Sequence, residues 1–286
     1  MTATLPHGLT ADRPARSAFA YVTLVTNPDY ATGAKALLRS IVWTGTEADL
    51  VVLHTDVAPE HLAPLSAIGA RLVQVELLPT SQAFNEAHAR DALHARAAFT
   101  KGDKPPFHTP LDNFAKLRLW QLDYERVVFL DADTLMLRNT DLLFQYPEFC
   151  AAPNVYESVA DFHRMNSGVF TARPSLDTFE AMMAVLDTPD AFWRRTDQTF
   201  LEHFFPDWHG LPVFYNMLQY VWFAMPDLWS WKAIHVLHFQ YEKPWQAHAK
   251  VGRLAPLIEL WRSFHDHGRP HWPIESLPPP GLDMLE

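Results

Sequence analysis

The sequence predicts an α/β fold in which helices flank a mostly parallel central sheet, and three observations support this. Short β-branched runs alternate with segments of helical periodicity over the first half of the chain. The strand-like runs are apolar throughout, as expected for strands buried on both faces. The chain has 286 residues, of which 48% are hydrophobic and 20% charged, which suits one large folded domain.

Each element follows from its local pattern. The first strand is expected over residues 19–26, FAYVTLVT, which Asn27-Pro28 closes. A helix is expected over residues 30–43, where Ala36, Leu37 and Ile41 recur at helical spacing. Further strands are expected over residues 50–54, 71–75, 126–130, 149–152, 168–172 and 233–239. Further helices are expected over residues 59–68, 86–98, 111–122, 176–186, 196–203 and 251–264.

These elements predict a single domain over residues 18–270. A loose N-terminal arm is expected over residues 1–17 and a proline-rich tail over residues 271–286. Residues 79–110 interrupt the strand–helix alternation with several prolines and a glycine. Long excursions of this kind are often lids in compact domains, so we interpret this segment as a lid over one edge of the sheet.

Charge and composition exclude several classes of partner. The formal net charge of −10 disfavours nucleic acid and anionic lipid. The single cysteine, Cys150, cannot form an internal disulfide. We expect neither a signal peptide nor a membrane span, because residues 1–17 lack an apolar core and residues 218–239 are interrupted by proline and charge. A cytoplasmic location is therefore the default expectation, and the oligomeric state, a dimer included, stays open.

The central motif is Asp131-Ala132-Asp133, which follows the apolar run of residues 126–130 directly. Ligands of open α/β sheets bind at the carboxyl ends of strands. Alternate residues of an extended segment point the same way, so the two carboxylates can converge on one cation. Carboxylate oxygens suit Mg²⁺ or Mn²⁺, which also bridge phosphate oxygens.

The same letters fit a second chemistry. Residues 129–134, FLDADT, match the nucleophile motif of haloacid-dehalogenase-type phosphatases. That chemistry needs a later acidic pair for Mg²⁺, and no such motif follows residue 133. We keep the phosphatase as a lesser alternative.

Four further groups of polar residues accompany this motif. Asn166 and Ser167 precede an apolar run and offer hydrogen bonds to sugar hydroxyls. Asp197 and Gln198 begin a predicted helix, where a carboxylate also suits the helix dipole. His238 ends a predicted strand and is a candidate third metal ligand, which favours Mn²⁺ over Mg²⁺. Lys243 is a candidate for neutralising a diphosphate.

With these motifs in this order along the sequence, the chain resembles glycosyltransferase family 8, the group that includes glycogenin and galactinol synthase. Eight blocks carry the resemblance: AYVTLVTNPDY, FAKLRLW, VVFLDADTLML, FCAAPN, NSGVF, TDQTF, LPVFYN and HFQYEKPW. It implies a GT-A fold with a Rossmann-like sheet, a UDP-sugar donor and Mn²⁺, with Mg²⁺ as the alternative.

The resemblance also implies roles for individual residues. The nucleoside site would consist of Leu24, Thr26, Asn27 and Tyr30, with the Tyr30 ring on uracil. The metal ligands would be Asp131, Asp133 and His238. The remaining donor contacts would come from Lys116, Ala132, Asn166, Ser167 and Lys243. Asp197 and Gln198 would lie at the anomeric carbon as the catalytic residues.

The sequence departs from the resemblance at three positions. Phe223 stands where glycogenin carries the tyrosine that it glucosylates, so we do not expect self-glucosylation. Arg194 replaces an acidic residue that precedes the family's Asp-Gln pair. Gln240-Tyr241-Glu242 replaces a loop that contains a glycine.

Together these observations predict a retaining, metal-dependent glycosyltransferase that moves a hexose, glucose or galactose, from a UDP-sugar to a hydroxyl. The acceptor is expected to be a small molecule, a saccharide or a glycolipid headgroup. Aromatic residues concentrate over residues 208–245, where they form either a crowded core or an acceptor platform, the core being the favoured interpretation. A nucleotide-sugar-binding protein without turnover is the second hypothesis.

Overall fold

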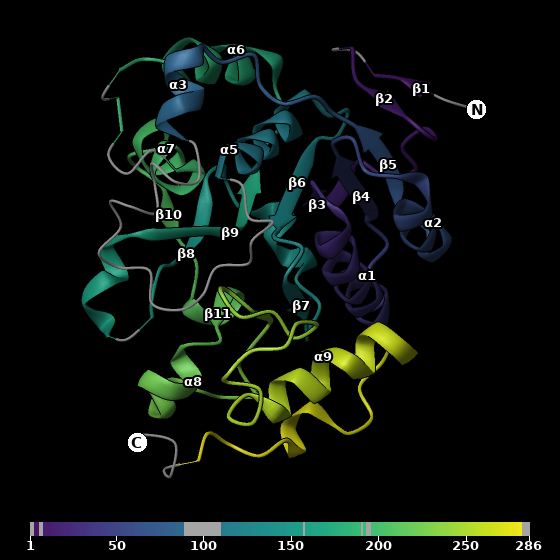
Figure 1. Ribbon diagram of the computed structural model, residues 1–286, viewed down its shortest axis with the longest axis vertical. Helices are drawn as coiled ribbons and strands as arrows, with labels where there is room; N and C mark the ends of the chain where they lie inside the picture. Colours follow the sequence, from purple (N-terminus) through teal and green to yellow (C-terminus); the bar gives the residue numbers. More distant parts are fainter. Residues whose placement is uncertain are drawn as a thin grey trace.

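The computed structural model describes residues 3–5, 8–88, 110–156, 158–189, 191–192 and 196–281. Nine strands form the main sheet (Figure 1). In their order across the sheet they are β1 (Ala3–Thr4), β2 (Thr10–Ala11), β5 (Arg71–Gln74), β4 (Asp49–His54), β3 (Phe19–Val25), β6 (Arg126–Leu130), β9 (Met165–Ala172), β8 (Cys150–Pro153) and β10 (His209–Gly210).

The centre of this sheet is parallel, whereas most pairs toward its margins are antiparallel and only β8 and β10 pair in parallel there. The strands β5, β4, β3 and β6 run parallel, whereas β9 is antiparallel to both β6 and β8. Since β3, β4 and β6 are almost completely buried, their continuous apolar runs match strands covered on both faces. The predicted α/β architecture is therefore confirmed.

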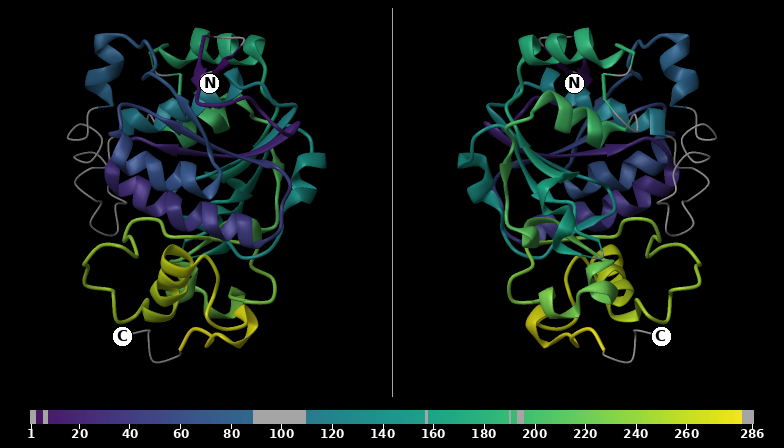
Figure 2. Two further views of the ribbon diagram at one scale, coloured as in Figure 1. Left: turned by 90° about the vertical axis from the view of Figure 1, so that its right-hand side faces the viewer. Right: turned by 90° about the vertical axis from the view of Figure 1, so that its left-hand side faces the viewer.

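Helices cover both faces of the main sheet (Figure 2). On one face lie α1 (Pro28–Trp43) and α2 (Pro59–Ile68), whose leucines share a core with β3 and β4. On the other face lie α6 (Leu176–Leu186), α7 (Asp197–Phe204) and the 3₁₀ helix η1 (Phe114–Gln121). The remaining short helices beside this sheet are α3 (Gln82–Ala87), α5 (Pro110–Asn113), η2 (Asp141–Gln145) and η3 (Val159–His163).

A second, three-stranded sheet connects the main sheet to the C-terminal part of the chain. Its order is β11 (Met217–Leu218), β12 (Val236–His238) and β7 (Thr134–Met136), with β12 antiparallel to β7. Around it pack α9 (Ala255–His267) and α8 (Val221–Ala224), which lie below the main sheet in Figure 1. The short helices here are η5 (Val213–Asn216), η6 (Pro226–Leu228) and η7 (Ile274–Ser276).

Much of the expected aromatic platform belongs to the core of this C-terminal part. Trp222, Trp229 and Trp231 are buried against one another, with ring centroids 5.0–6.0 Å apart. These tryptophans therefore stabilise the fold, which confirms the favoured interpretation of a crowded core for them.

Other boundaries differ from the sequence prediction for local reasons. Residues 111–122 do not form one α-helix, because α5 passes into the 3₁₀ helix η1 after Asn113. The last helix begins at Ala255 rather than residue 251, with Pro256 in its first turn. The expected strand 233–239 shortens to β12, since its neighbours pair only there. Residues 89–109 lie outside the described residues. They include most of the expected helix 86–98 and of the expected lid 79–110.

The N-terminal segment is more ordered than a loose arm. Its strand β2 pairs with β5, and Leu5, Leu9 and Ala11 are buried in the core. The tail also contacts the domain, because the Trp231 indole donates to the carbonyl of Pro278 at 2.8 Å. The division of the chain at residues 18 and 270 stays a prediction. Within the described residues, no helix has both the length and the apolar character needed to cross a membrane.

Candidate active site

The Asp131-Ala132-Asp133 motif forms a tight turn between β6 and β7, where the main sheet meets the small sheet. Thr134 donates its backbone N–H and its hydroxyl to the carbonyl of Asp131, at 3.1 and 2.8 Å. The two carboxylates therefore converge through a turn and not through an extended segment, which corrects the expected geometry. Buried Ala132 lies against α1, where a Cβ at Gly33 would come within 2.5 Å of its carbonyl oxygen.

The register of the small sheet brings His238 to the same turn. In this register His238 pairs with Thr134, and Phe239 donates its N–H to the carbonyl of Asp133 at 2.9 Å. The imidazole Nε2 lies 3.3 Å from an Asp133 oxygen and 4.0 Å from an Asp131 oxygen. One ligand atom from each of the three residues lies within 4.8 Å of the others.

This donor set fits a divalent cation. Two ligand atoms that are each about 2.1 Å from one ion are between roughly 3.0 and 4.2 Å apart, as the Nε2–oxygen distances are. Two carboxylates and an imidazole supply oxygen and nitrogen ligands together, whereas Mg²⁺ prefers an all-oxygen shell. Asp133 and His238 are buried, and the Asp131 side chain is 32% exposed, so the site opens to solvent on the Asp131 side.

Three asparagines fix the orientation of His238. The backbone N–H of Gly168 donates to Asn166 Oδ1 at 2.9 Å, which assigns the oxygen of that amide. Asn216 therefore donates its Nδ2 to Asn166 Oδ1, and Asn166 donates its Nδ2 to Asn154, each at 2.8 Å. The Oδ1 of Asn216 must then accept from His238 Nδ1, 2.9 Å away. The Nε2 lone pair of His238 consequently faces the carboxylates of Asp131 and Asp133, as a metal ligand requires.

Gly168 provides the space in which this imidazole lies. A Cβ at position 168 would come within 2.4 Å of His238 Cε1 and 2.6 Å of Nδ1. The sequence predicted a strand that starts at residue 168, directly after Asn166 and Ser167. The structure instead places all three residues inside β9, which begins at Met165.

Two lysines neutralise the carboxylates of the site. Lys243 makes an ion pair with Asp133 and donates to the carbonyl of Phe239 at 2.9 Å. Burial opposes ionisation of Asp133, but Lys243 and His238 outweigh it and hold the pKa of this carboxyl well below its usual range. Asp133 is therefore a carboxylate at neutral pH.

Lys116 connects the motif to the residues at the start of α7. Its buried ammonium lies 3.3 Å from Asp131 and 2.7 Å from Asp197. Burial opposes its charge, yet the two carboxylates raise the Lys116 pKa above its ordinary value. Asp197 also accepts from the Ser167 hydroxyl at 2.9 Å, and the amide oxygen of Gln198 accepts from the Ser167 N–H at 3.3 Å. Asp197 and Gln198 begin α7, which Thr196 caps, as the sequence predicted.

The predicted nucleoside residues lie at the carboxyl end of β3. Leu24 is within β3, and Thr26 follows it. Asn27 caps α1, because its side chain accepts from the Tyr30 N–H at 3.0 Å, so this asparagine has a structural task in addition to its predicted role. Tyr30 lies in the first turn of α1, and burial, then the charges of Asp133 and Asp131, raise the pKa of its phenol.

Sequence reasoning did not single out Asn154 or Asn216. Each is the last residue of a quoted block, FCAAPN or LPVFYN, where an apolar run ends in an amide. This pattern could have marked both asparagines as candidates. Only the fold shows that they form hydrogen bonds with Asn166 and His238. Arg194, which departs from the resemblance, lies outside the described residues.

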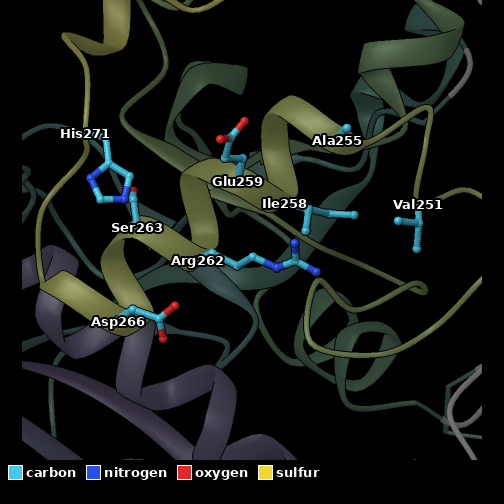
Figure 3. A pocket seen from close by; sticks show the side chains of 8 residues that line it. All are labelled: Val251, Ala255, Ile258, Glu259, Arg262, Ser263, Asp266 and His271. Carbon is cyan, nitrogen blue, oxygen red and sulfur yellow. The ribbon is translucent and has the colours of Figure 1, made fainter.

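A pocket of about 340 Å³ lies away from this cluster, along the exposed side of α9 (Figure 3). Its lining comes from α9 and the adjoining segments: Val251, Ala255, Ile258, Glu259, Arg262, Ser263, Asp266 and His271. None of the predicted site residues contributes to it.

Solved glycosyltransferases share this architecture. GlyE of Streptococcus pneumoniae TIGR4 aligns with a TM-score of 0.62 and 19% identity over 86% of this chain and 60% of that protein. The galactosyltransferase LgtC, solved with donor and acceptor sugar analogues, aligns with a TM-score of 0.56 and 15% identity over 85% of this chain and 95% of LgtC. The fold is accordingly the expected GT-A fold.

Two relatives show similarity in sequence as well. UDP-glucuronate:xylan alpha-glucuronosyltransferase 2 of Arabidopsis thaliana is 33% identical over 213 residues, or 73% of this chain and 31% of the plant protein. Glycogenin-1 of Oryctolagus cuniculus is 32% identical over 237 residues, or 79% of this chain and 65% of that protein. The chain thus spans about a third of the length of the plant relative.

The family model described as glycosyl transferase family 8 matches residues 21–249, which include the Asp131–Asp133 turn, the asparagine chain, His238 and Lys243. This membership decides against the dehalogenase-type alternative. The chain belongs to glycosyl transferase family 8.

Proposed function

We propose that this protein is a retaining glycosyltransferase that moves a hexose, glucose or galactose, from a UDP-sugar to a hydroxyl acceptor. The observation that carries the proposal is the convergence of Asp131, Asp133 and His238 in a chain of family 8. The plant relative is named for UDP-glucuronate, so a hexuronate is the donor to test beside the hexoses.

Asp131, Asp133 and His238 would hold a divalent cation, Mn²⁺ being favoured by the imidazole. Bound there, the cation supplies Lewis-acid stabilisation of the charge that develops on the leaving diphosphate. Lys243 lies against Asp133 and is available to shift onto a phosphate oxygen when donor binds. Its ammonium would then stabilise the same developing charge.

Asp197 is the proposed electrostatic partner of the anomeric carbon. Its carboxylate is oriented by the Lys116 ammonium and the Ser167 hydroxyl, so one oxygen is committed to two donors. In the transition state the sugar becomes oxocarbenium-like, and a fixed carboxylate stabilises that positive charge. Gln198, the next residue along α7, would help to orient the donor sugar.

The reaction balances without a strong protein base. The bond between the anomeric carbon and the diphosphate oxygen breaks, and its electron pair leaves with UDP. The acceptor oxygen forms its bond on the same face, and its proton passes to the phosphate oxygen of the departing UDP. A covalent glycosyl intermediate on Asp197 is the less favoured route. Lys116 and Ser167 both contact Oδ2 of Asp197, and these contacts lower the nucleophilicity of that carboxylate oxygen.

The remaining parts of the proposal are the nucleoside contacts, the acceptor and the location. Leu24, Thr26, Asn27 and Tyr30 would contact the nucleoside. The acceptor would be a small molecule, a saccharide or a glycolipid headgroup, and Asn166 would position sugar hydroxyls beside Ser167. A cytoplasmic location stays a prediction of the sequence.

The test is UDP release from UDP-glucose, UDP-galactose and UDP-glucuronate, with Mn²⁺ or with EDTA. We expect Mn²⁺-dependent release from one of these donors, because water can take the place of the acceptor and hydrolyse the donor slowly. Asp133→Asn should abolish this release, whereas Asp207→Asn, at an exposed carboxylate outside the cluster, should leave it unchanged. Binding of UDP with Mn²⁺ but no release, even with acceptors, would support the second hypothesis of a protein without turnover.

A further inference from the structure

The loop after His238 contains a backbone conformation that its residue does not favour. Tyr241 has a φ of 64° and is the one non-glycine residue with positive φ among those that the structure describes. A side chain with a Cβ is sterically disfavoured in this left-handed region, which glycine occupies freely. Such conformations persist where surrounding contacts impose them, and they concentrate at functional sites.

Gln219 imposes this conformation. Its fully buried side-chain amide donates to the carbonyls of Gln240 and Glu242, the residues on either side of Tyr241. Its backbone N–H also donates to the side-chain oxygen of Gln240 at 3.0 Å. The backbone on both sides of Tyr241 is therefore held by one residue.

This loop lies between two members of the active-site cluster. Tyr241 is three residues after His238 and two before Lys243, whose ammonium contacts Asp133 and the carbonyl of Phe239. The disfavoured conformation consequently determines where the Tyr241 ring lies relative to the cluster.

The Tyr241 ring packs against two other tyrosines. Its centroid is 6.0 Å from Tyr156 and 5.4 Å from Tyr220. Tyr220 is buried and donates its hydroxyl to the Glu242 carboxylate, so it also stabilises the loop that contains Tyr241. Tyr156 and Tyr241 are each half-buried, in contrast to the buried Tyr220.

Tyr156 also lies close in sequence to a residue that helps to form the active site. It is two residues after Asn154, which begins the asparagine chain that ends at His238. Burial, then the neighbouring Tyr241 phenol, raise the pKa of the Tyr156 phenol; the charge of Arg164 opposes this shift and the charge of Asp133 adds to it.

We propose that Tyr156 and Tyr241 form an acceptor subsite that stacks on a ring of a neutral saccharide and directs one hydroxyl toward the anomeric carbon of the donor. The inference rests on the proposed function and names the acceptor class. The C–H faces of sugar rings pack on aromatic rings, and phenolic hydroxyls hydrogen-bond the hydroxyls at the ring edge. An aromatic side chain is retained at a position that favours glycine because its ring contacts the acceptor.

The variant Tyr241→Gly separates this role from a structural one. Glycine removes the backbone strain but also the packing of the ring against Tyr156 and Tyr220, so its two effects on the melting temperature oppose each other. The acceptor kinetics separate the two roles, because the loss of a ring that served only to pack would leave them unchanged. Tyr241→Phe keeps the ring, and Trp272→Ala removes an exposed aromatic outside the subsite as the matched control.

The kinetic test uses xylohexaose, maltohexaose and lactose as acceptors, with the donor that the wild type hydrolyses. For the saccharide that accepts sugar, Tyr241→Gly should raise the acceptor KM at least tenfold. Tyr241→Phe and Trp272→Ala should change KM less than threefold. An unchanged KM in Tyr241→Gly would overturn the proposal.

A binding measurement keeps this test independent of turnover. Saturation-transfer NMR with the same three saccharides, in the presence of UDP and Mn²⁺, should show contact with the wild type and at least a tenfold weaker affinity for Tyr241→Gly. Absence of contact with every saccharide, or equal contact in the variant, would overturn the subsite. Failure of all UDP release with intact saccharide contact would instead overturn the proposed function alone.

Discussion

Replacing Asn216 should weaken metal binding without touching a metal ligand. Asn216 is fully buried, and its side chain joins His238 Nδ1 to Asn166 Oδ1 at 2.9 and 2.8 Å. In Asn216→Leu the imidazole loses the acceptor that keeps the proton on Nδ1. The proton can then move to Nε2, the nitrogen that faces Asp131 and Asp133, and a protonated Nε2 cannot ligate.

The magnitude follows from the chemistry of such partners. Loss of a hydrogen bond behind a metal-bound histidine costs about 10–100-fold in affinity. That range corresponds to roughly 1.4–2.8 kcal/mol of binding free energy. The upper part of the range applies here, because the leucine also leaves a buried Nδ1 with no acceptor.

Two measurements test this prediction in the metal-free and metal-loaded protein. Long-range ¹H–¹⁵N correlation spectra, with His238 assigned through His238→Gln, should show the Nδ1–H tautomer in the wild type and its loss in Asn216→Leu. Calorimetry should give the reduced Mn²⁺ affinity. Asn216→Asp, which retains an oxygen toward Nδ1, should keep the tautomer. An unchanged tautomer and affinity in Asn216→Leu would refute the role of the asparagine chain.

Three further substitutions test neighbouring parts of the structure. Gly168→Ala should displace the His238 imidazole, since the new Cβ would lie 2.4 Å from Cε1, and Mn²⁺ affinity should fall about 10–100-fold by calorimetry. Lys116→Met should lower kcat about 10²–10³-fold, and its pH–rate profile should lose activity from the acidic side, because without the ammonium the pKa of Asp197 rises. Arg71→Met should cost about 3 kcal/mol in urea unfolding, because buried Arg71 binds both oxygens of Asp123; a loss below 1 kcal/mol would contradict this.

The sequence predicted those parts of the site that depend on neighbouring residues. The Asp131–Asp133 turn follows β6 directly, and Asp197-Gln198 begins α7 behind a threonine cap. In both cases the residues that place the side chain lie within a few positions of it. Strand ends and helix starts are recognisable from local pattern, so these positions could be located before the fold was known.

The parts that the sequence did not predict depend on contacts between distant segments. Asn216 and Asn166 are 50 residues apart, and Lys243 and Asp133 are 110 apart. Their meeting depends on the register of β12 against β7, where His238 opposes Thr134. A one-residue change of register would turn the imidazole to the other face of the small sheet. Local periodicity carries no information on that register.

The charges of the site explain why two buried lysines accompany a metal-binding motif. Asp131, Asp133 and Asp197 carry three negative charges, and Lys116 and Lys243 carry two positive charges. Without these lysines, three carboxylates in and around a largely buried turn would raise one another's pKa and take up protons. With them, the five side chains leave one negative charge for a divalent cation to neutralise. Burial still raises the pKa of Asp131 despite the opposing charge of Lys116. With all five side chains charged, a divalent cation would leave the cluster with one positive charge, which suits a diphosphate.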